Sequence, residues 1–363
     1  MASTSTSPKI LLTGATGYIG GSILTHLLNS SSSALSTTTI SCLLRGPDRA
    51  AKLTATYGSR VNPIVYKDLD DIEATVAAAA EHDIVISTTQ GWHVASSQAL
   101  LRGLAQRKAA TGRDVWFIQT SGTSNVASKP APKGSATQEV REFDDLKDDV
   151  YGYEKAREQE TPYGQRTAEL AVVDTGLELG IKTLAIMSPT IFGFGSGLWN
   201  KMSIQVPSLA GVVLQSKQPV VLGDGSGVWD HVHIEDLAEL YLLVVRRILE
   251  QGGEGVPTGK KGVIFSGNGR HSWLDVTQGI ADACFEKGVL ADREVKNISA
   301  AEVKKILGVG DIMADDIVEL SFASDSRTVS SAARALGWNP TRGEEAWKRE
   351  FKDAVEAVLA KGK

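Results

Sequence analysis

This 363-residue chain contains three glycines spaced three residues apart, a pattern that could bind the phosphates of a dinucleotide. Gly14, Gly17 and Gly20 directly follow a short apolar run and open a segment with helical spacing. Gly14 would allow a tight turn, Gly17 a close backbone approach to a pyrophosphate, and Gly20 close packing of helix on strand. Free N–H groups and the positive dipole at a helix N-terminus favour bound phosphate. This context favours a dinucleotide site over a ligand-free glycine turn. The same site is expected to include Thr16, Tyr18 and Ile19.

The end of the second predicted strand indicates which dinucleotide would bind. An acidic residue there would hold the ribose 2′-hydroxyl of NAD, whereas Arg45 suits the 2′-phosphate of NADP. Arg49 and Lys52 follow one and two turns later and could close the same pocket, although such charges are commonly a solvated face. We therefore expect NADP(H), with NAD(H) as the alternative. Asp68 and Leu69, after the third predicted strand, are expected at the adenine edge.

Strands and helices alternate through the first half of the chain. The hydrophobic pattern predicts strands at 9–12, 39–44, 61–66, 83–86, 115–119 and 183–187. It predicts helices at 18–29, 72–80, 96–110, 165–179 and 236–251. This alternation predicts an α/β fold with a doubly wound, parallel, Rossmann-type sheet and a smaller, mostly helical C-terminal substrate lobe.

The same pattern suggests a division of the chain. Residues 1–8 are expected to be a disordered tail, and residues 9–190 to form the dinucleotide-binding lobe. Within that lobe, residues 124–162 are rich in charge, proline and glycine, which indicates a surface excursion. Residues 191–363 are expected to form the substrate lobe, interleaved with the Rossmann core.

The composition argues against several classes of protein, including nucleic-acid-binding and membrane-spanning proteins. The net charge of −5 argues against a nucleic-acid partner, and no apolar run reaches the roughly 20 residues of a membrane span. The N-terminus lacks the apolar core of a signal peptide, and the two cysteines, Cys42 and Cys284, are far apart. We expect a cytoplasmic protein that acts on a small molecule, with no metal and no membrane partner. A homo-oligomer is compatible with these features.

Several motifs together resemble the extended branch of the short-chain dehydrogenase/reductase superfamily, over nearly the whole chain. The resemblance includes nucleotide-sugar epimerases, dihydroflavonol-reductase-like enzymes and a group of fungal epimerase/dehydratase-like proteins. It implies that Pro189 lines the nicotinamide, and Thr88 is expected among the cofactor contacts. The motifs that carry it are Arg45–Lys52, Ser188–Gly193, Gly223–Leu237 and Ala335–Pro340.

Proton transfer in this superfamily depends on a Tyr-x-x-x-Lys motif and a nearby serine or threonine. By the resemblance, Tyr163 matches the tyrosine, but Thr167 stands at the lysine position. After the fifth predicted strand, Gly122 stands at the usual hydroxyl position, with Ser121 and Thr123 beside it. The resemblance therefore implies a degraded catalytic trio. Without the lysine, a tyrosine near its ordinary pKa of ~10 is a poor base at neutral pH.

A second Tyr-x-x-x-Lys occurs earlier, at Tyr151 and Lys155. Either Tyr163 is the matching tyrosine and the lysine has been lost, or the helix begins earlier and Tyr151 with Lys155 is the working pair. We favour Tyr163, because the other pair lies inside the charged excursion.

Aromatic residues and histidines near the expected pocket suggest the substrate. Nucleotide-sugar epimerases carry an arginine that binds diphosphate, where this chain has Trp229. An indole cannot replace a guanidinium against phosphate, which argues against a nucleotide sugar. Trp92, His93, Trp229 and His231 instead suggest a less polar substrate, with ordinary packing as the alternative.

The leading hypothesis is an NADP(H)-dependent oxidoreductase that acts on a small carbonyl or alcohol. Two alternatives remain open at this stage, because a fold does not determine a function. One is a non-redox isomerase, cyclase or lyase on the same scaffold. The other is a binding protein that senses NADP(H) and contacts a partner through the acidic segment 139–149.

Overall fold

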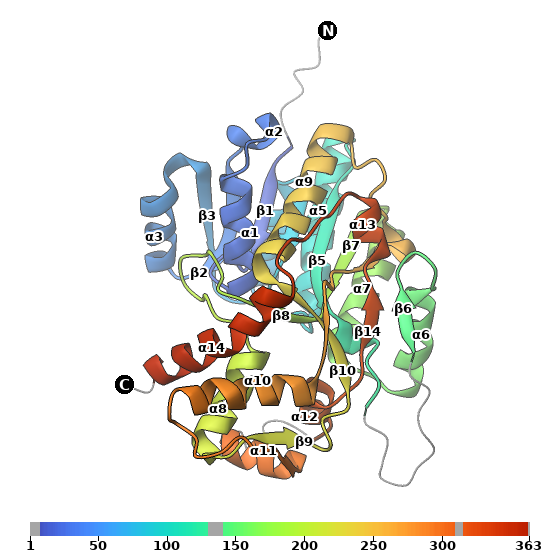
Figure 1. The fold of residues 1–363 in the computed structure, drawn as a ribbon. Coiled ribbons are helices and arrows are strands. Elements are labelled where there is room, and N and C mark those ends of the chain that lie inside the picture. Colours follow the sequence, from blue (N-terminus) through green and yellow to red (C-terminus); the bar gives the residue numbers. More distant parts are fainter. Residues whose placement is uncertain (1–7, 130–140, 309–314, 362–363) are drawn as a thin grey trace.

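The computed structural model describes residues 8–129, 141–308 and 315–361. The expected tail lies almost entirely outside these residues, as does 130–140 of the expected excursion. In the described part of the chain, seven parallel strands form the central sheet in the order β11-β7-β5-β4-β1-β2-β3 (Figure 1). The strands are β1 (Ile10–Thr13), β2 (Ile40–Arg45), β3 (Val61–Tyr66), β4 (Ile84–Ser87), β5 (Trp116–Gly122), β7 (Lys182–Ser188) and β11 (Val263–Phe265).

Alternating residues of the strands pack against helices on both faces of this sheet. Ile10 and Leu12 of β1 belong to the core beneath one layer of helices, while Leu11 between them belongs to the core beneath the other. The first layer contains α1 (Tyr18–Leu28), α2 (Ser33–Ser36), α3 (Pro47–Tyr57) and α9 (Ile234–Gln251). The second contains α4 (Ile72–Ala80), α5 (Val94–Thr111) and α7 (Gly164–Leu179). The chain therefore has the predicted doubly wound, parallel α/β fold.

The excursion expected at 124–162 is more ordered than its composition indicated. Its described residues form a 3-10 turn (Thr123–Asn125), β6 (Glu142–Asp144) and α6 (Val150–Glu160). Helix α6 packs on α7 and buries Tyr151 and Glu154. The expected excursion therefore contains a strand and a helix within residues 141–160. Helix α6 was not expected because most of its residues are charged or polar and only a few of them are buried.

A second body of helices lies below the central sheet in Figure 1. Its core joins α8 (Gln205–Ser216), α10 (Trp273–Glu286) and α14 (Glu344–Lys361). A small sheet of β8 (Thr190–Phe192), β10 (Val228–His233) and β12 (Arg270–Ser272) connects this core to the rest. Two further parallel pairs complete it: β9 (Val220–Leu222) with β13 (Lys296–Ile298), and β14 (Arg327–Val329) with β6. The remaining helices are α11 (Ala300–Leu307), α12 (Asp315–Phe322) and α13 (Ser331–Ala335).

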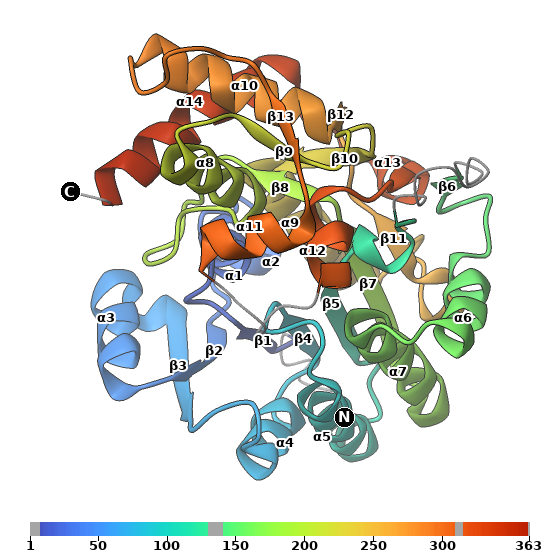
Figure 2. The ribbon, with the colours of Figure 1, turned by 90° about the horizontal axis from the view of Figure 1, so that it is seen from below.

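The carboxyl ends of the central strands face this second body. Figure 2 views the molecule from that side, with α11 and α12 near the centre. In open parallel sheets, ligands bind outside the carboxyl ends of strands, where the strand order reverses. Here the reversal falls between β1 and β4, which pair directly. Within the described residues, none of the helices has the length and apolar character to span a bilayer.

Candidate active site

The glycine motif forms the turn between β1 and α1. Gly14 has a φ of +77°, and a Cβ on it would lie 2.4 Å from Thr88 Oγ1. A Cβ on Gly20 would lie 2.3 Å from the carbonyl oxygen of Gly14. Gly17 precedes α1 without any side-chain cap, and a Cβ on it would meet only the Gly14 oxygen, at 3.2 Å. Gly14 and Gly20 are therefore required by packing, whereas Gly17 leaves the N-terminus of α1 open to a ligand.

A cavity of about 430 Å³ lies at the carboxyl ends of β1 to β4. This volume is within the range of small-molecule and cofactor sites. Most residues expected to contact the cofactor meet there, from the connections that follow four strands. The lining includes Gly14, Thr16, Gly17, Arg45, Arg49, Asp68, Leu69, Thr88 and His93.

Five residues expected at the cofactor do not line this cavity: Gly20, which packs on the Gly14 turn, and Tyr18, Ile19, Lys52 and Pro189. Tyr18 is buried and donates from its hydroxyl to the carbonyl oxygen of Gly193 at 2.6 Å, while Ile19 packs against the core. Pro189 is buried at the junction of β7 and β8. The Lys52 ammonium lies over the Trp199 ring, 5.6 Å from its centroid. Tyr18 thus connects α1 to the segment after β8, and the Lys52 ammonium contacts Trp199 and does not line the pocket.

Arg45 and Arg49 are the basic residues at the end of β2 that do line the cavity. Both side chains are exposed, and neither forms an ion pair with any residue that the structure describes. A free guanidinium can bind a phosphate with two parallel hydrogen bonds. The positive charge at this end of the cavity is therefore available to an anionic ligand.

Tyr163 lies beside this cavity, immediately before α7. Its hydroxyl lies 3.2 Å from Ser124 Oγ and 3.3 Å from Gln165 Oε1. Ser124 also donates to Gln165 Oε1 at 2.8 Å. A Cβ on Gly91 would lie 3.6 Å from Gln165 Nε2, and Gly91 directly follows the cavity-lining Gln90. Tyr163, Ser124 and Gln165 form a compact polar cluster next to the nucleotide cavity.

The hydroxyl group beside Tyr163 differs from the predicted ones. The Thr123 side chain is fully buried, and Ser121 Oγ accepts a hydrogen bond from Asn125 Nδ2 at 3.3 Å. Ser124 takes their place because the strand ends at Gly122 and the following 3-10 turn redirects the side chains. Strand alternation could not predict this turn. The polar run Thr123-Ser124-Asn125 was the only signal of it.

Thr167 does not occupy the position of the family lysine relative to Tyr163. Tyr163 has φ −138° and ψ 119°, so it is an extended N-cap and not part of the helix. The four-residue spacing therefore does not bring the two side chains onto one face. Thr167 donates instead to Glu158 Oε1, and Glu158 Oε2 accepts from the Tyr163 backbone N–H at 3.1 Å. Thr167 therefore belongs to the contact between α6 and α7.

The alternative pair, Tyr151 and Lys155, lies away from the nucleotide cavity. Both side chains bind Asp174 of α7. The Tyr151 ring also lies 5.4 Å from the ammonium of Lys260. Lys260 precedes β11, so this cluster lies toward the amino ends of the strands. That is the opposite edge of the sheet from the nucleotide cavity.

A buried acidic pair lies beneath the turn that carries Ser124. Glu154 and Glu169 are both fully buried, and Asn125 Nδ2 donates to Glu169 Oε2 at 3.2 Å. Burial, and then the neighbouring Glu169 carboxyl, raises the pKa of Glu154 well above its ordinary value. Two carboxyl groups buried side by side favour the protonated form of one of them, which agrees with this raised pKa. Arg166, also buried, donates to the backbone oxygen of Asn125 at 2.9 Å.

The residues expected at the substrate divide into two groups. Trp92 is 61% exposed and lies beside Gly164, while His93 caps α5 and contacts Asp70 Oδ1 at 3.2 Å. These two lie near Tyr163 and the cavity. Trp229 and His231 are buried packing residues instead, so the structure does not bring them to the cavity.

Tyr163 is partly buried and packs against an apolar core that contains Trp229 and Trp273. The indole N–H of Trp229 donates to Ser324 Oγ at 2.9 Å, which explains why a tryptophan stands there. The buried members of this core include Ala127, Val303, Val318, Leu320 and Phe322.

This sheet, glycine turn and tyrosine–serine pair define a member of the extended short-chain dehydrogenase/reductase superfamily. The chain belongs to the NAD dependent epimerase/dehydratase family, whose model matches residues 10–256. Oxidase ucsJ from Acremonium sp. is 28% identical over 341 residues, or 92% of each chain.

Solved structures support the same fold. A UDP-N-acetylglucosamine 4-epimerase from Methanobrevibacter ruminantium M1, in complex with UDP-N-acetylmuramic acid, aligns with a TM-score of 0.59 at 14% identity, covering 98% of this chain and 99% of that one. Vestitone reductase from alfalfa (Medicago sativa) aligns with a TM-score of 0.57 at 15% identity, over 98% and 99%. The enzymes that share this fold thus include an epimerase and a reductase.

Proposed function

We propose that this protein is an NADP(H)-dependent oxidoreductase that acts on a small carbonyl or alcohol which is not a nucleotide sugar. The observation that carries the proposal is the Tyr163 hydroxyl, 3.2 Å from Ser124 Oγ and next to the nucleotide cavity. A tyrosine hydroxyl with a hydrogen-bonding partner suits proton transfer to or from a reacting oxygen.

The residues of the cavity fit a dinucleotide. Gly17 and the uncapped N-terminus of α1 would bind the pyrophosphate, and Asp68 with Leu69 would lie at the adenine. Arg45 and Arg49 would bind a 2′-phosphate, which supports NADP(H) over NAD(H). The bound nicotinamide would supply the hydride acceptor or donor.

Residues of the chain itself would donate the proton and hydrogen-bond the substrate oxygen. In the direction of reduction, Tyr163 would donate a proton to the carbonyl oxygen, and Ser124 would hydrogen-bond that oxygen. Gln165 Oε1 accepts from both hydroxyls and so holds them together. Among the described residues, no lysine lies at the family position beside Tyr163. Reduction, which needs an acid, is therefore favoured over oxidation.

Two features support a substrate of low polarity. The apolar core beside Tyr163 offers little to a sugar, and Trp229 is committed to Ser324 and cannot bind a diphosphate. The curated relative is called an oxidase, which supports redox chemistry over a non-redox isomerase or a sensor.

Deuteride transfer tests the proposal. The protein would be incubated with NADPH deuterated at nicotinamide C4 and a panel of aromatic and aliphatic aldehydes and ketones. We expect deuterium in at least one alcohol product by mass spectrometry, and no change in UDP-sugars run in parallel. Tight NADPH binding without any transfer would favour the sensor or non-redox alternatives, while conversion of UDP-sugars would contradict the substrate class.

A further inference from the structure

The side-chain amide of Gln165 is hydrogen-bonded at its oxygen and unpaired at its nitrogen. Its Oε1 accepts from Ser124 Oγ at 2.8 Å and from the Tyr163 hydroxyl at 3.3 Å. Its Nε2 makes no hydrogen bond with any residue that the structure describes, and the residue is only partly buried. A primary amide nitrogen carries two hydrogens that it can donate. Two donors are therefore available beside Tyr163.

The unpaired nitrogen lies against backbone and not against other side chains. A Cβ on Gly122 would lie 2.8 Å from Nε2, and a Cβ on Gly91 would lie 3.6 Å from it. Gly122 ends β5, and Gly91 belongs to the connection between β4 and α5, directly after the cavity-lining Gln90. Because β4 and β5 are paired neighbours, Nε2 lies at the carboxyl ends of two adjacent strands, next to the nucleotide cavity.

The amide nitrogen also occupies space that other residues at position 122 would fill. A contact of 2.8 Å is shorter than a Cβ tolerates, so even alanine at position 122 would displace the amide. Gly122 is the position at which the resemblance places a hydroxyl side chain. In this chain a donor from α7 reaches that space instead, while Ser124 reaches Tyr163 from the turn that follows the strand.

We propose that Gln165 is a catalytic residue whose Nε2 donates a hydrogen bond to the carbonyl oxygen of the substrate. This role rests on the redox function proposed above. When the carbonyl carbon accepts hydride from NADPH, the electron pair of the C=O bond moves to the oxygen, and Tyr163 gives that oxygen its proton. Gln165 keeps both amide hydrogens. An N–H group aimed at an oxygen that becomes negative stabilises the transition state more than the ground state.

Gln165 adds donors that Ser124 alone does not supply. The Ser124 hydroxyl has one hydrogen, which Gln165 Oε1 accepts in this structure, whereas no described residue accepts from Nε2. A carbonyl oxygen only accepts hydrogen bonds, so a site rich in donors suits a ketone or an aldehyde. The amide thus gives this site a reason to favour reduction.

The pH dependence of Gln165→Glu tests the role, because glutamate has the same shape and keeps Oε1 but loses both amide hydrogens. At pH 8 and saturating NADPH, kcat for carbonyl reduction should fall roughly tenfold to a thousandfold. Between pH 8 and pH 5 the carboxyl group takes up a proton and can donate again, so the kcat of the variant relative to that of the intact protein should rise. A structural role would give a ratio that does not depend on pH.

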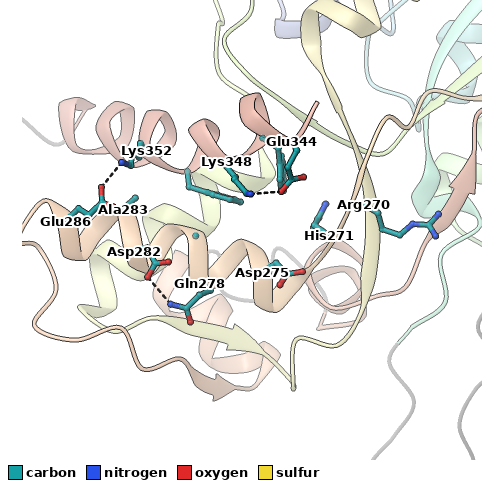
Figure 3. Close-up of a pocket in the computed structure, with 13 residues that line it drawn as sticks. Arg270, His271, Asp275, Gln278, Asp282, Ala283, Glu286, Glu344, Lys348 and Lys352 are labelled. Atoms are coloured by element: carbon teal, nitrogen blue, oxygen red, sulfur yellow. Dashed lines mark hydrogen bonds and ion pairs between the residues drawn. The ribbon is translucent and has the colours of Figure 1, made fainter. Parts of the chain in front are cut away.

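Two further variants complete this experiment. Gln165→Met has a similar length and no donor, so its loss of kcat should be the same at every pH. Gln278→Glu is the matched control on α10 in the second body of helices, where Figure 3 shows the amide bonded to Asp282. Gln278 does not line the nucleotide cavity, so kcat and its pH dependence should stay unchanged.

Nitrogen-15 NMR of the side-chain amides provides a readout that needs no turnover. The Gln165 Nε2 resonance is assigned by its loss in Gln165→Met. With NADP⁺ bound, no hydride is available, and the ketone that is reduced fastest, or acetophenone if none is reduced, should shift this resonance. The hydrocarbon with the same carbon skeleton should not shift it.

The two readouts distinguish this inference from the redox function itself. A ketone-specific shift in a protein that reduces no ketone would support the donor role and contradict the redox function. Normal turnover with no shift at Nε2, or with a pH-independent ratio for Gln165→Glu, would overturn the donor role and leave the redox function in place. The absence of both turnover and shift would overturn both.

Discussion

The Tyr163 hydroxyl lies 3.2 Å from Ser124 Oγ, although the two residues are 39 positions apart in the chain. Ser124 reaches this place because β5 ends in a 3-10 turn, and Tyr163 because it precedes α7 in an extended conformation. Glu158 of α6 fixes the second of these features by accepting from the Tyr163 backbone N–H. Helix α6, which lies between the two residues in the chain, therefore shapes the site although none of its residues lines the nucleotide cavity.

Ser124 should matter more to turnover than its neighbour Thr123. Removing the Ser124 hydroxyl takes away the hydrogen-bond partner of Tyr163, so we expect Ser124→Ala to slow carbonyl reduction roughly tenfold to a thousandfold. Thr123→Val keeps the buried shape and removes a hydroxyl that bonds nothing in the described structure, so turnover should change little. Steady-state kcat for both variants decides this. Equal losses would mean that the turn is placed differently.

Cofactor preference should depend on Arg45 and not on Lys52. In Arg45→Ala, the affinity for NADPH should fall roughly tenfold or more, because a charge-assisted bond to the 2′-phosphate is lost, while NADH is unaffected. Lys52→Ala is the matched control, since the Lys52 ammonium lies over Trp199. Calorimetric Kd values for both cofactors provide the measurement. Equal affinities of the intact protein for NADPH and NADH would contradict the assignment.

Substitutions of two glycines in the same turn should have different effects, one on cofactor binding and the other on stability. Gly17→Val should abolish dinucleotide binding with little loss of Tm, because its side chain would lie where the pyrophosphate approaches. Gly20→Val should lower Tm sharply, because even a Cβ would lie 2.3 Å from the Gly14 oxygen. Thermal melts and cofactor titrations of both variants test this. Normal binding in folded Gly17→Val would refute the phosphate site.

The buried acidic pair should make stability depend on pH. An exposed glutamate in the unfolded chain loses its proton near pH 4.3, but Glu154 keeps its proton in the folded state because its pKa is raised. Above that pH the unfolded state binds fewer protons, so the free energy of unfolding falls as pH rises, by up to about 1.4 kcal/mol per pH unit. The loss ends once the pH exceeds the folded-state pKa.

Glu154→Gln should therefore flatten this slope and stabilise the protein at neutral and alkaline pH. Glu160→Gln, an exposed residue on the same helix, serves as the control and should keep the slope. Urea denaturation at several pH values between about 5 and 8 measures the difference. An unchanged slope in Glu154→Gln would show that another group carries the proton.

Local pattern was sufficient to predict most of the central sheet. Buried parallel strands are continuous apolar runs, so β1 to β5 and β7 could be found within a few residues. Strand β11 could not, because three residues are too short a run to distinguish from a loop. Helix α6 could not either, because its sequence is mostly charged or polar and only Val150, Tyr151 and Glu154 are buried.

The part of the site that lies at the ends of strands could be predicted from the sequence, because the strand itself fixes where those residues lie. Gly14, Gly17, Arg45 and Asp68 all lie at or shortly after strand ends and line one cavity. Side chains whose direction depends on a turn or on tertiary packing were harder to place. Ser124 depends on the 3-10 turn, and His231 was assigned from proximity in sequence but stacks on Trp347 in the core.

The most direct test compares the two tyrosines in deuteride transfer at saturating NADPH. Tyr163→Phe should lower the rate by roughly a hundredfold to ten-thousandfold, as expected for loss of a general acid, while the Kd for NADPH stays unchanged. Tyr151→Phe removes the hydroxyl that binds Asp174 on the far edge of the sheet, and its rate should stay close to that of the intact protein. A slow Tyr151→Phe beside a fully active Tyr163→Phe would contradict the account.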